Sequence, residues 1–318
     1  MRRPIALLLA LLILLTCPLA WADKPKDVPK LSPEEIPDTP AGIKNYLLLC
    51  VDSWGGKANN LGNTDGMVLV TVDEIMQKIM LTSFIRDIWI QKEDGGFNRL
   101  SRFVPQNGHD QKAVEDLIAI YGSHFGVKVD HYIVIDWSMI QNIIDAVGGV
   151  ELTIINNEAI RLKDKEAYRS SWTDPVLKGA GTYRFTGHAA VIYMRIRGAT
   201  KVDGVNYDFA RTGRARQVLS SIAASLADIN YERAMELLDV VVNNTLVTDM
   251  SAADLLEAAQ LAFELRGAPI EEMRIPISGT YESLNYTSGA GQQIDFVANR
   301  EALQEFLYGG FVVREDDE

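Results

Sequence analysis

Short runs of apolar residues, each long enough for one β-strand, recur along the first half of the chain. They are residues 46–52 (YLLLCVD), 67–73 (MVLVTVD), 78–84 (KIMLTSF), 131–137 (HYIVIDW) and 150–154 (VELTI). A short polar turn separates the second run from the third, which predicts that these two strands are neighbours.

Apolar residues spaced three and four apart predict helices between and after these strands. The helical pattern covers residues 110–125, 138–147, 187–194, 211–229 and 251–265. Because strands and helices interleave, we expect an α/β fold in which helices cover a mixed sheet. The chain has 318 residues, 47% of them apolar, and neither an internal repeat nor a second linker, so we expect a single folded domain.

The N-terminus has the anatomy of a secretory signal. Two arginines precede an unbroken apolar run over residues 5–15, and Ala20 and Ala22 supply a small-x-small cleavage site, so residues 1–22 are predicted to be a signal peptide. An uncleaved membrane anchor over residues 5–22 and a lipoprotein attached through Cys17 are the alternatives. In each case the remaining chain lies outside the membrane.

Five of the eleven prolines lie within residues 23–43, which predicts a semi-rigid extended linker ahead of the domain. We expect the folded domain over residues 44–311 and an acidic, solvated tail over 312–318. The only cysteines are Cys17 and Cys50, and Cys17 lies in the targeting segment, so no internal disulfide is expected. The net charge of −12 argues against nucleic acid as a partner.

Arginines gather in one part of this acidic chain: Arg195, Arg197, Arg211, Arg214 and Arg216. A guanidinium group presents planar pairs of N–H donors that match phosphate and carboxylate oxygens. The cluster therefore predicts an anionic ligand, and a polyanion is the first candidate.

The helix predicted over residues 211–229 places some of these arginines inward. Its apolar stripe runs through Val218, Ile222, Leu226 and Ile229. Extended backwards, this stripe passes through Arg211 and Arg214 near the helix N-terminus, where the dipole favours anions. Asp208 lies one turn earlier and suits a cap or an ion pair. Arg216 falls on the opposite face, and we expect it to be solvated. A salt-bridge network with Asp208 would satisfy one inward arginine but not the whole set.

Two carboxylates fall at the ends of neighbouring predicted strands. Asp52 ends the first strand and Asp65 lies just before the second, which suits a hard cation whose shell is completed by water. The alternative is that one or both aspartates cap turns. Arg86 and Asp87 form a charged pair between apolar residues, which also fits an internal ion pair. No zinc-type His/Cys spacing, nucleophile elbow, P-loop or dinucleotide fingerprint is present.

Six segments in order make the pattern specific: LLLCVDSWGG, GNTDGMVLVTV, LTSFIRDIWI, DHYIVIDWSMIQNIIDAVGGVELTI, GTYRFTGHAAVIYMRIR and YDFARTGRARQVL. Together they span most of residues 44–220 and resemble the LytR-CpsA-Psr family. The resemblance implies an α/β/α sandwich with an apolar lipid tunnel. It also implies an extracytoplasmic phosphotransferase, secreted or anchored at the outer face of the membrane of a Gram-positive-type cell. Such enzymes move a glycopolymer, teichoic acid or capsule, from polyprenyl pyrophosphate to peptidoglycan.

The resemblance assigns roles to individual residues. It implies Mg²⁺ or Mn²⁺ at Asp52 and Asp65, and a pyrophosphate held by arginines that Asp208 supports. These arginines are Arg86, Arg195, Arg197, Arg211 and Arg214.

The chain also departs from the family pattern. Trp54 and Asn63 stand where arginines are expected, Ile85 replaces a proline, Ala215 replaces a glutamine, and residues 99–101 match loosely. We therefore keep two alternatives beside the transferase: a non-catalytic protein that binds polyprenyl (pyro)phosphate lipids, and a lipid pyrophosphatase.

Overall fold

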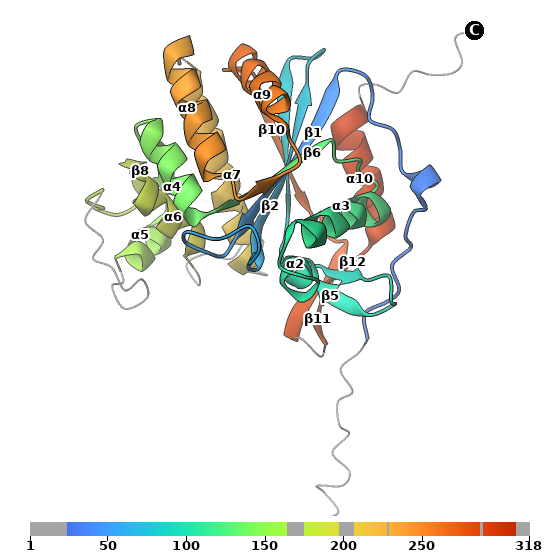
Figure 1. The fold of residues 1–318 in the computed structure, drawn as a ribbon. Coiled ribbons are helices and arrows are strands. Elements are labelled where there is room, and N and C mark those ends of the chain that lie inside the picture. The colour runs from blue at the N-terminus through green and yellow to red at the C-terminus, as the bar shows by residue number, and fades with distance from the viewer. Residues whose placement is uncertain (1–23, 164–174, 197–206, 228, 287–288, 310–318) are drawn as a thin grey trace, which may run out of the picture.

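A computed structural model describes residues 24–163, 175–196, 207–227, 229–286 and 289–309. Its centre is a six-stranded mixed sheet with the strand order β10-β3-β2-β1-β6-β9 (Figure 1). The strands are β1 (Ile43–Val51), β2 (Thr64–Asp73), β3 (Lys78–Phe84), β6 (His131–Asp136), β9 (Val247–Thr248) and β10 (Ile270–Ile275). β1 pairs antiparallel with β2 and parallel with β6, and β3 pairs parallel with β10. The expected mixed sheet is confirmed, and β2 and β3 are neighbours as predicted.

Helices cover both faces of this sheet (Figure 1). They are α2 (Phe103–Gln106), α3 (Gln111–Phe125), α4 (Trp137–Ala146), α5 (Asn156–Leu162), α6 (Gly187–Arg195), α7 (Tyr207–Leu226), α8 (Tyr231–Asn244), α9 (Ala252–Glu264) and α10 (Phe296–Tyr308). One hydrophobic core lies between the sheet and α3 with α10, and a second contains residues of α4, α5, α6 and α7. The α/β/α sandwich is therefore confirmed.

The apolar run of β1 divides between the two faces because side chains alternate along a strand. Leu47, Leu49 and Val51 belong to the core that contains α3 and α10. Leu48 and Cys50 belong to the opposite core. Both faces of this strand are covered, which explains why its sequence is continuously apolar rather than alternating.

Within the described residues, three two-stranded sheets lie outside the central sheet. They pair β4 (Trp89–Gln91) with β5 (Phe97–Arg99), β7 (Val150–Ile154) with β8 (Gly181–Phe185), and β11 (Tyr281–Tyr286) with β12 (Gly289–Ile294). The predicted strand at residues 150–154 is thus a strand, but of a separate two-stranded sheet.

The proline-rich segment packs on the domain over its described part, residues 24–42. Val28 is buried and its N–H donates to Oε1 of Gln91 (3.2 Å). The N–H of Leu31 donates to the carbonyl of Ser123 at 2.8 Å. The described part of the segment includes a 3₁₀ helix over Pro33–Glu35 and is packed against the domain. Within the described residues, no helix is both long and apolar enough to cross a bilayer.

Candidate active site

A β-bulge sets the position of Asp65. Cys50 lies opposite Gly66, whereas Val51 lies opposite Thr64, so Asp65 is the extra residue on β2. A bulge bends the strand and re-aims the side chain it inserts. Here it directs the carboxylate into a nearly closed position, where the side chain is 4% exposed.

Two arginines from distant segments bind the Asp65 carboxylate. Nη1 of Arg86, in the turn after β3, donates to Oδ1 at 2.8 Å. Nη2 of Arg211, in the first half of α7, donates to Oδ2 at 2.9 Å. Burial raises the pKa of Asp65, but Arg211 and Arg86 outweigh that effect and hold the pKa below its ordinary value. Asp65 is therefore an ionised carboxylate clamped between two guanidinium groups.

Arg86 also contacts the aspartate that follows it. Its Nε lies 3.5 Å from Oδ2 of Asp87, and Asp87 in turn accepts from Nη1 of Arg99 at 3.1 Å. The interpretation of Arg86 and Asp87 as an internal ion pair is thus confirmed, and Arg86 takes part in a second pair with Asp65 as well.

Asp52 follows the end of β1, on the strand next to Asp65. Its N–H donates to the carbonyl of Asn63 (2.8 Å), which holds the two strand ends together. Oδ1 of Asp52 accepts from Nη2 of Arg195 at 3.2 Å and from the indole N–H of Trp137 at 3.0 Å. The side chains of Asp52 and Arg195 are 37% and 36% exposed. Unlike Asp65 and Arg211, this pair is open to solvent.

The inward arginines of α7 are buried as predicted. Arg211 is paired with Asp65, as described above, and Arg214 is paired with Glu158. Nη1 of Arg214 lies 3.3 Å from Oε1 of Glu158, and its Nη2 donates to the carbonyl of Ile196 at 2.7 Å. Burial lowers the pKa of Arg214, and Glu158 partly offsets this effect. Arg214 is therefore a buried cation whose charge an acid on α5 balances.

Arg216 was expected to be solvated, and that prediction is wrong. Its side chain is only 16% exposed, its Nε lies 2.9 Å from Oε2 of Glu272 on β10, and it also contacts Ser83 of β3. The cause is that α7 packs against β3 and the edge strand β10 as well as against its inward neighbours.

The predicted site residues are brought together only in part. Arg86 and Arg211 contact Asp65, and Arg195 contacts Asp52. Both aspartates lie at the same end of the neighbouring strands β1 and β2, whereas Arg214 is paired with Glu158. Arg197 and the side chain of Asp208 lie outside the described residues.

Glu158 and Trp137 are site residues that sequence reasoning missed. Glu158 precedes Arg214 by 56 residues on a short helix, so no local pattern signals the pair. Trp137 directly follows β6, at the sheet edge where Asp52 ends β1, and that juxtaposition was the available signal.

The carboxylates fit a cation that binds together with phosphate. Within the described residues, no group of three or more Asp, Glu, His or Cys side chains could hold a metal alone. Mg²⁺ commonly takes one or two carboxylates and completes its shell with phosphate oxygens and water. Asp52 offers one accessible carboxylate, whereas both oxygens of Asp65 accept from Arg86 and Arg211, so a cation at Asp65 would have to displace a guanidinium group. The metal assignment stays a prediction.

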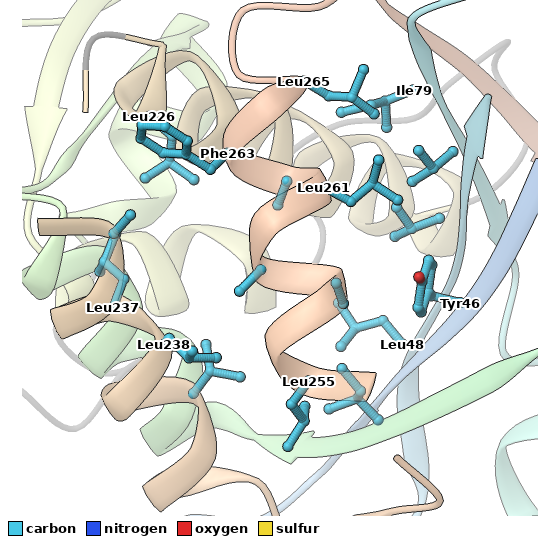
Figure 2. A pocket seen from close by; sticks show the side chains of 18 of the residues that line it. Tyr46, Leu48, Ile79, Leu226, Leu237, Leu238, Leu255, Leu261, Phe263 and Leu265 are labelled. Atoms are coloured by element: carbon cyan, nitrogen blue, oxygen red, sulfur yellow. The ribbon is translucent and has the colours of Figure 1, made fainter. Parts of the chain in front are cut away.

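An apolar cavity of about 400 Å³ lies between the sheet and helices α8 and α9. Figure 2 shows leucines of α8 and α9 facing Tyr46 and Leu48 of β1 across it. Among the described side chains that line it, only Tyr46 and Met250 carry a heteroatom. Leu48 precedes Asp52 by four residues, or about 13 Å of strand at ~3.3 Å per residue. The cavity and the charged cluster therefore share β1.

The sequence profile of the LytR_cpsA_psr family matches residues 22–303. The chain belongs to this family. The predicted resemblance is thereby confirmed, and it extends beyond residues 44–220 to most of the chain.

Relatives within the family include named transferases. The chain is 28% identical over 245 residues to the polyisoprenyl-teichoic acid–peptidoglycan teichoic acid transferase TagU of Oceanobacillus iheyensis, covering 76% of this chain and 68% of that protein. It is 27% identical over 188 residues to the biofilm regulatory protein A of Streptococcus mutans, covering 56% of this chain and only 43% of that protein.

Solved structures agree with the fold. A TagT chain bound to the ligand LIIa-WTA superposes with a TM-score of 0.66 at 16% identity, covering 87% of this chain and 95% of that chain. Bacillus subtilis TagV superposes with a TM-score of 0.63 at 17% identity, covering 85% of this chain and 98% of that chain. At these identities the superpositions establish the shared fold of the family.

Proposed function

We propose that this protein is a cell-wall glycopolymer transferase that acts outside the cytoplasmic membrane. It moves a teichoic-acid- or capsule-type polymer from polyprenyl pyrophosphate to peptidoglycan. The observation that supports this most is the meeting of Arg86, Arg195 and Arg211 with two carboxylates at one sheet edge. The apolar cavity on the same strand supports a lipid-linked donor, and family membership supports the reaction class.

The accessible arginines are proposed to hold the pyrophosphate. Arg195 is bound to a half-exposed Asp52, so a phosphate oxygen can replace the carboxylate without uncovering a buried charge. Arg86 is also partly exposed. Arg211 and Arg214 are buried and paired, and their proposed role is to fix α7 and Asp65 in place. Mg²⁺ or Mn²⁺, when bound at Asp52 and Asp65, would neutralise phosphate charge.

In the proposed transfer, a peptidoglycan hydroxyl forms a new O–P bond to the phosphorus that carries the glycan. The bridging P–O bond breaks, polyprenyl phosphate leaves, and the hydroxyl proton passes to this departing phosphate. The protein contributes position and charge, which is the usual basis of catalysis in phosphoryl transfer. Removing one preorganised donor of this kind commonly lowers the rate roughly a hundredfold or more.

The test uses full-length protein in detergent with a polyprenyl-pyrophosphate-linked glycan, peptidoglycan and Mg²⁺. We expect release of polyprenyl phosphate, and a rate lowered roughly a hundredfold by Arg195→Ala. Arg184→Ala is the matched control, because Arg184 lies on the separate β7–β8 sheet and donates to the carbonyl of Gly148. Failure of the wild-type protein to turn over a donor that it demonstrably binds would contradict the transferase.

A non-catalytic lipid-binding protein is the second candidate. Trp54 and Asn63 remove two arginines that the family pattern expects, and both residues are exposed beside the site, whereas the apolar cavity is retained. Thermal stabilisation by polyprenyl phosphate without any turnover would support this candidate. Phosphate release that continues without peptidoglycan would instead indicate the pyrophosphatase.

A further inference from the structure

An exposed tryptophan stands beside the candidate phosphate site. Trp54 comes two residues after Asp52, and 47% of it is exposed to solvent. The guanidinium carbon of Arg195 lies 6.0 Å from the centre of its ring, and the ring of His188 lies 6.4 Å away. A large aromatic surface is therefore displayed next to the accessible Asp52–Arg195 pair.

The turn that carries Trp54 is held in place by hydrogen bonds to α4 and its N-cap. The N–H of Gly55 donates to Oγ of Ser138 (3.1 Å), and the N–H of Gly56 donates to Oδ2 of Asp136 (2.8 Å). The N–H of Trp137 donates to the carbonyl of Ser53 at 3.2 Å. The backbone on both sides of Trp54 is thus fixed, which lowers the entropy cost of binding a ligand against its ring.

Packing and charge do not account for this tryptophan. Trp89 and Trp137 are buried, whereas about half of Trp54 is in solvent. Nor is Trp54 needed to hold Arg195, because Trp137 lies closer to that guanidinium, at 5.2 Å, and donates to the same carboxylate. A distance of 6.0 Å is at the outer limit of a cation–π contact.

We propose that Trp54 stacks against the first sugar ring of a pyrophosphate-linked saccharide. This inference rests on the proposed function and names the part of the donor that the site recognises. The sugar is joined to the phosphate through a single oxygen, so a phosphate bound by Arg195 brings the sugar beside Trp54. A pyranose offers a face of C–H groups, which suits the flat, apolar and electron-rich face of an indole. Trp54 is thus a specificity-determining residue for the glycan.

The experiment compares two ligands with full-length protein in detergent micelles: polyprenyl pyrophosphate alone and the same lipid carrying one N-acetylhexosamine. Trp54→Ala is expected to weaken binding of the sugar-bearing lipid about tenfold and to change binding of the bare lipid by less than about twofold. Trp54→Phe keeps a smaller aromatic face, so its affinity for the sugar-bearing lipid is expected to lie between those of the wild type and Trp54→Ala. Met76→Ala is the control, because Met76 is 63% exposed in the turn at the other end of β2 and should affect neither ligand.

Other outcomes would overturn the inference in distinguishable ways. Equal weakening of both ligands would mean that Trp54 acts through Arg195 on the phosphate. Loss of binding to protein-free lipid vesicles, with both ligand affinities unchanged, would mean that Trp54 contacts the membrane. If the wild-type protein binds the bare lipid and Trp54→Ala alters neither affinity, this inference fails alone. If the wild-type protein binds neither lipid, the proposed function fails with it.

Discussion

Replacing Asp65 with asparagine tests whether this carboxylate organises the site. The change keeps the shape of the side chain but removes the charge that Arg86 and Arg211 share at 2.8 and 2.9 Å. The amide oxygen can still accept a hydrogen bond from one guanidinium group. The amide NH₂ group, however, faces the N–H groups of the other guanidinium, so two donors oppose each other. Arg211 is only 8% exposed, so water cannot fully replace the ion pair that it loses.

The magnitude follows from this burial. Removing one partner of a buried ion pair costs about 3–5 kcal/mol. We expect the lower end, about 3 kcal/mol, because Arg86 reaches solvent and also contacts Asp87. At about 2 °C per kcal/mol for a domain of this size, the melting temperature should fall by roughly 6 °C.

The assay is thermal and denaturant unfolding of Asp65→Asn beside the wild type at pH 7. The control is Asp94→Asn, which breaks a surface pair with Lys92 and should leave the melting temperature unchanged within error. The pKa of Asp65 is lowered in the folded protein, so its stabilisation is complete above the ordinary pKa and is lost as pH falls through the lowered value. The difference between Asp65→Asn and wild type should therefore shrink below about pH 4. A variant that melts within about 1 °C of wild type at pH 7 would refute the clamp.

Three further outcomes are expected. Burial lowers the pKa of His124 to about 3, so acidification below its ordinary pKa of about 6.5 should destabilise the protein by about 1.4 kcal/mol per pH unit. Unfolding measured against pH should lack this slope in His124→Gln, and an unchanged slope would contradict the prediction. Arg214→Met should cost about 3–5 kcal/mol in denaturant unfolding, and adding Glu158→Gln should recover part of it, whereas additive losses would deny the pairing. Ala259→Phe should fill the apolar cavity and weaken polyprenyl phosphate binding in a thermal-shift assay without lowering stability; undiminished binding would place the lipid elsewhere.

The sequence located the central strands well because their apolar runs are continuous and are covered on both faces. It did not predict α8, although Leu237, Leu238 and Val241 of that helix follow a helical spacing. The hairpin of β4 with β5 and that of β11 with β12 were not predicted. These hairpins contact each other where the indole N–H of Trp89 donates to the carbonyl of Leu284, 195 residues away, and such contacts have no local signal.

The site could be predicted wherever periodicity carried the information. The stripe of α7 placed Arg211 and Arg214 inward correctly, because Val218 fixes the phase of the helix against the core. The same stripe misplaced Arg216, because a single inward face cannot describe a helix that is packed on two sides. Asp65 was found from its position, but the bulge that aims it depends on pairing with β1 and has no local signal.

The helices above the apolar cavity have a consequence for how the protein behaves on its own. Between them, α8 and α9 contribute one buried residue, Leu237. The apolar residues of these two helices are therefore only partly covered, and the hydrocarbon chain of the proposed donor would cover more of them. Lipid binding should therefore also order α8 and α9, and amide hydrogen exchange in both helices should slow when the lipid is present. Without the lipid, amide exchange in these two helices should be faster than in α3, which packs in the buried core.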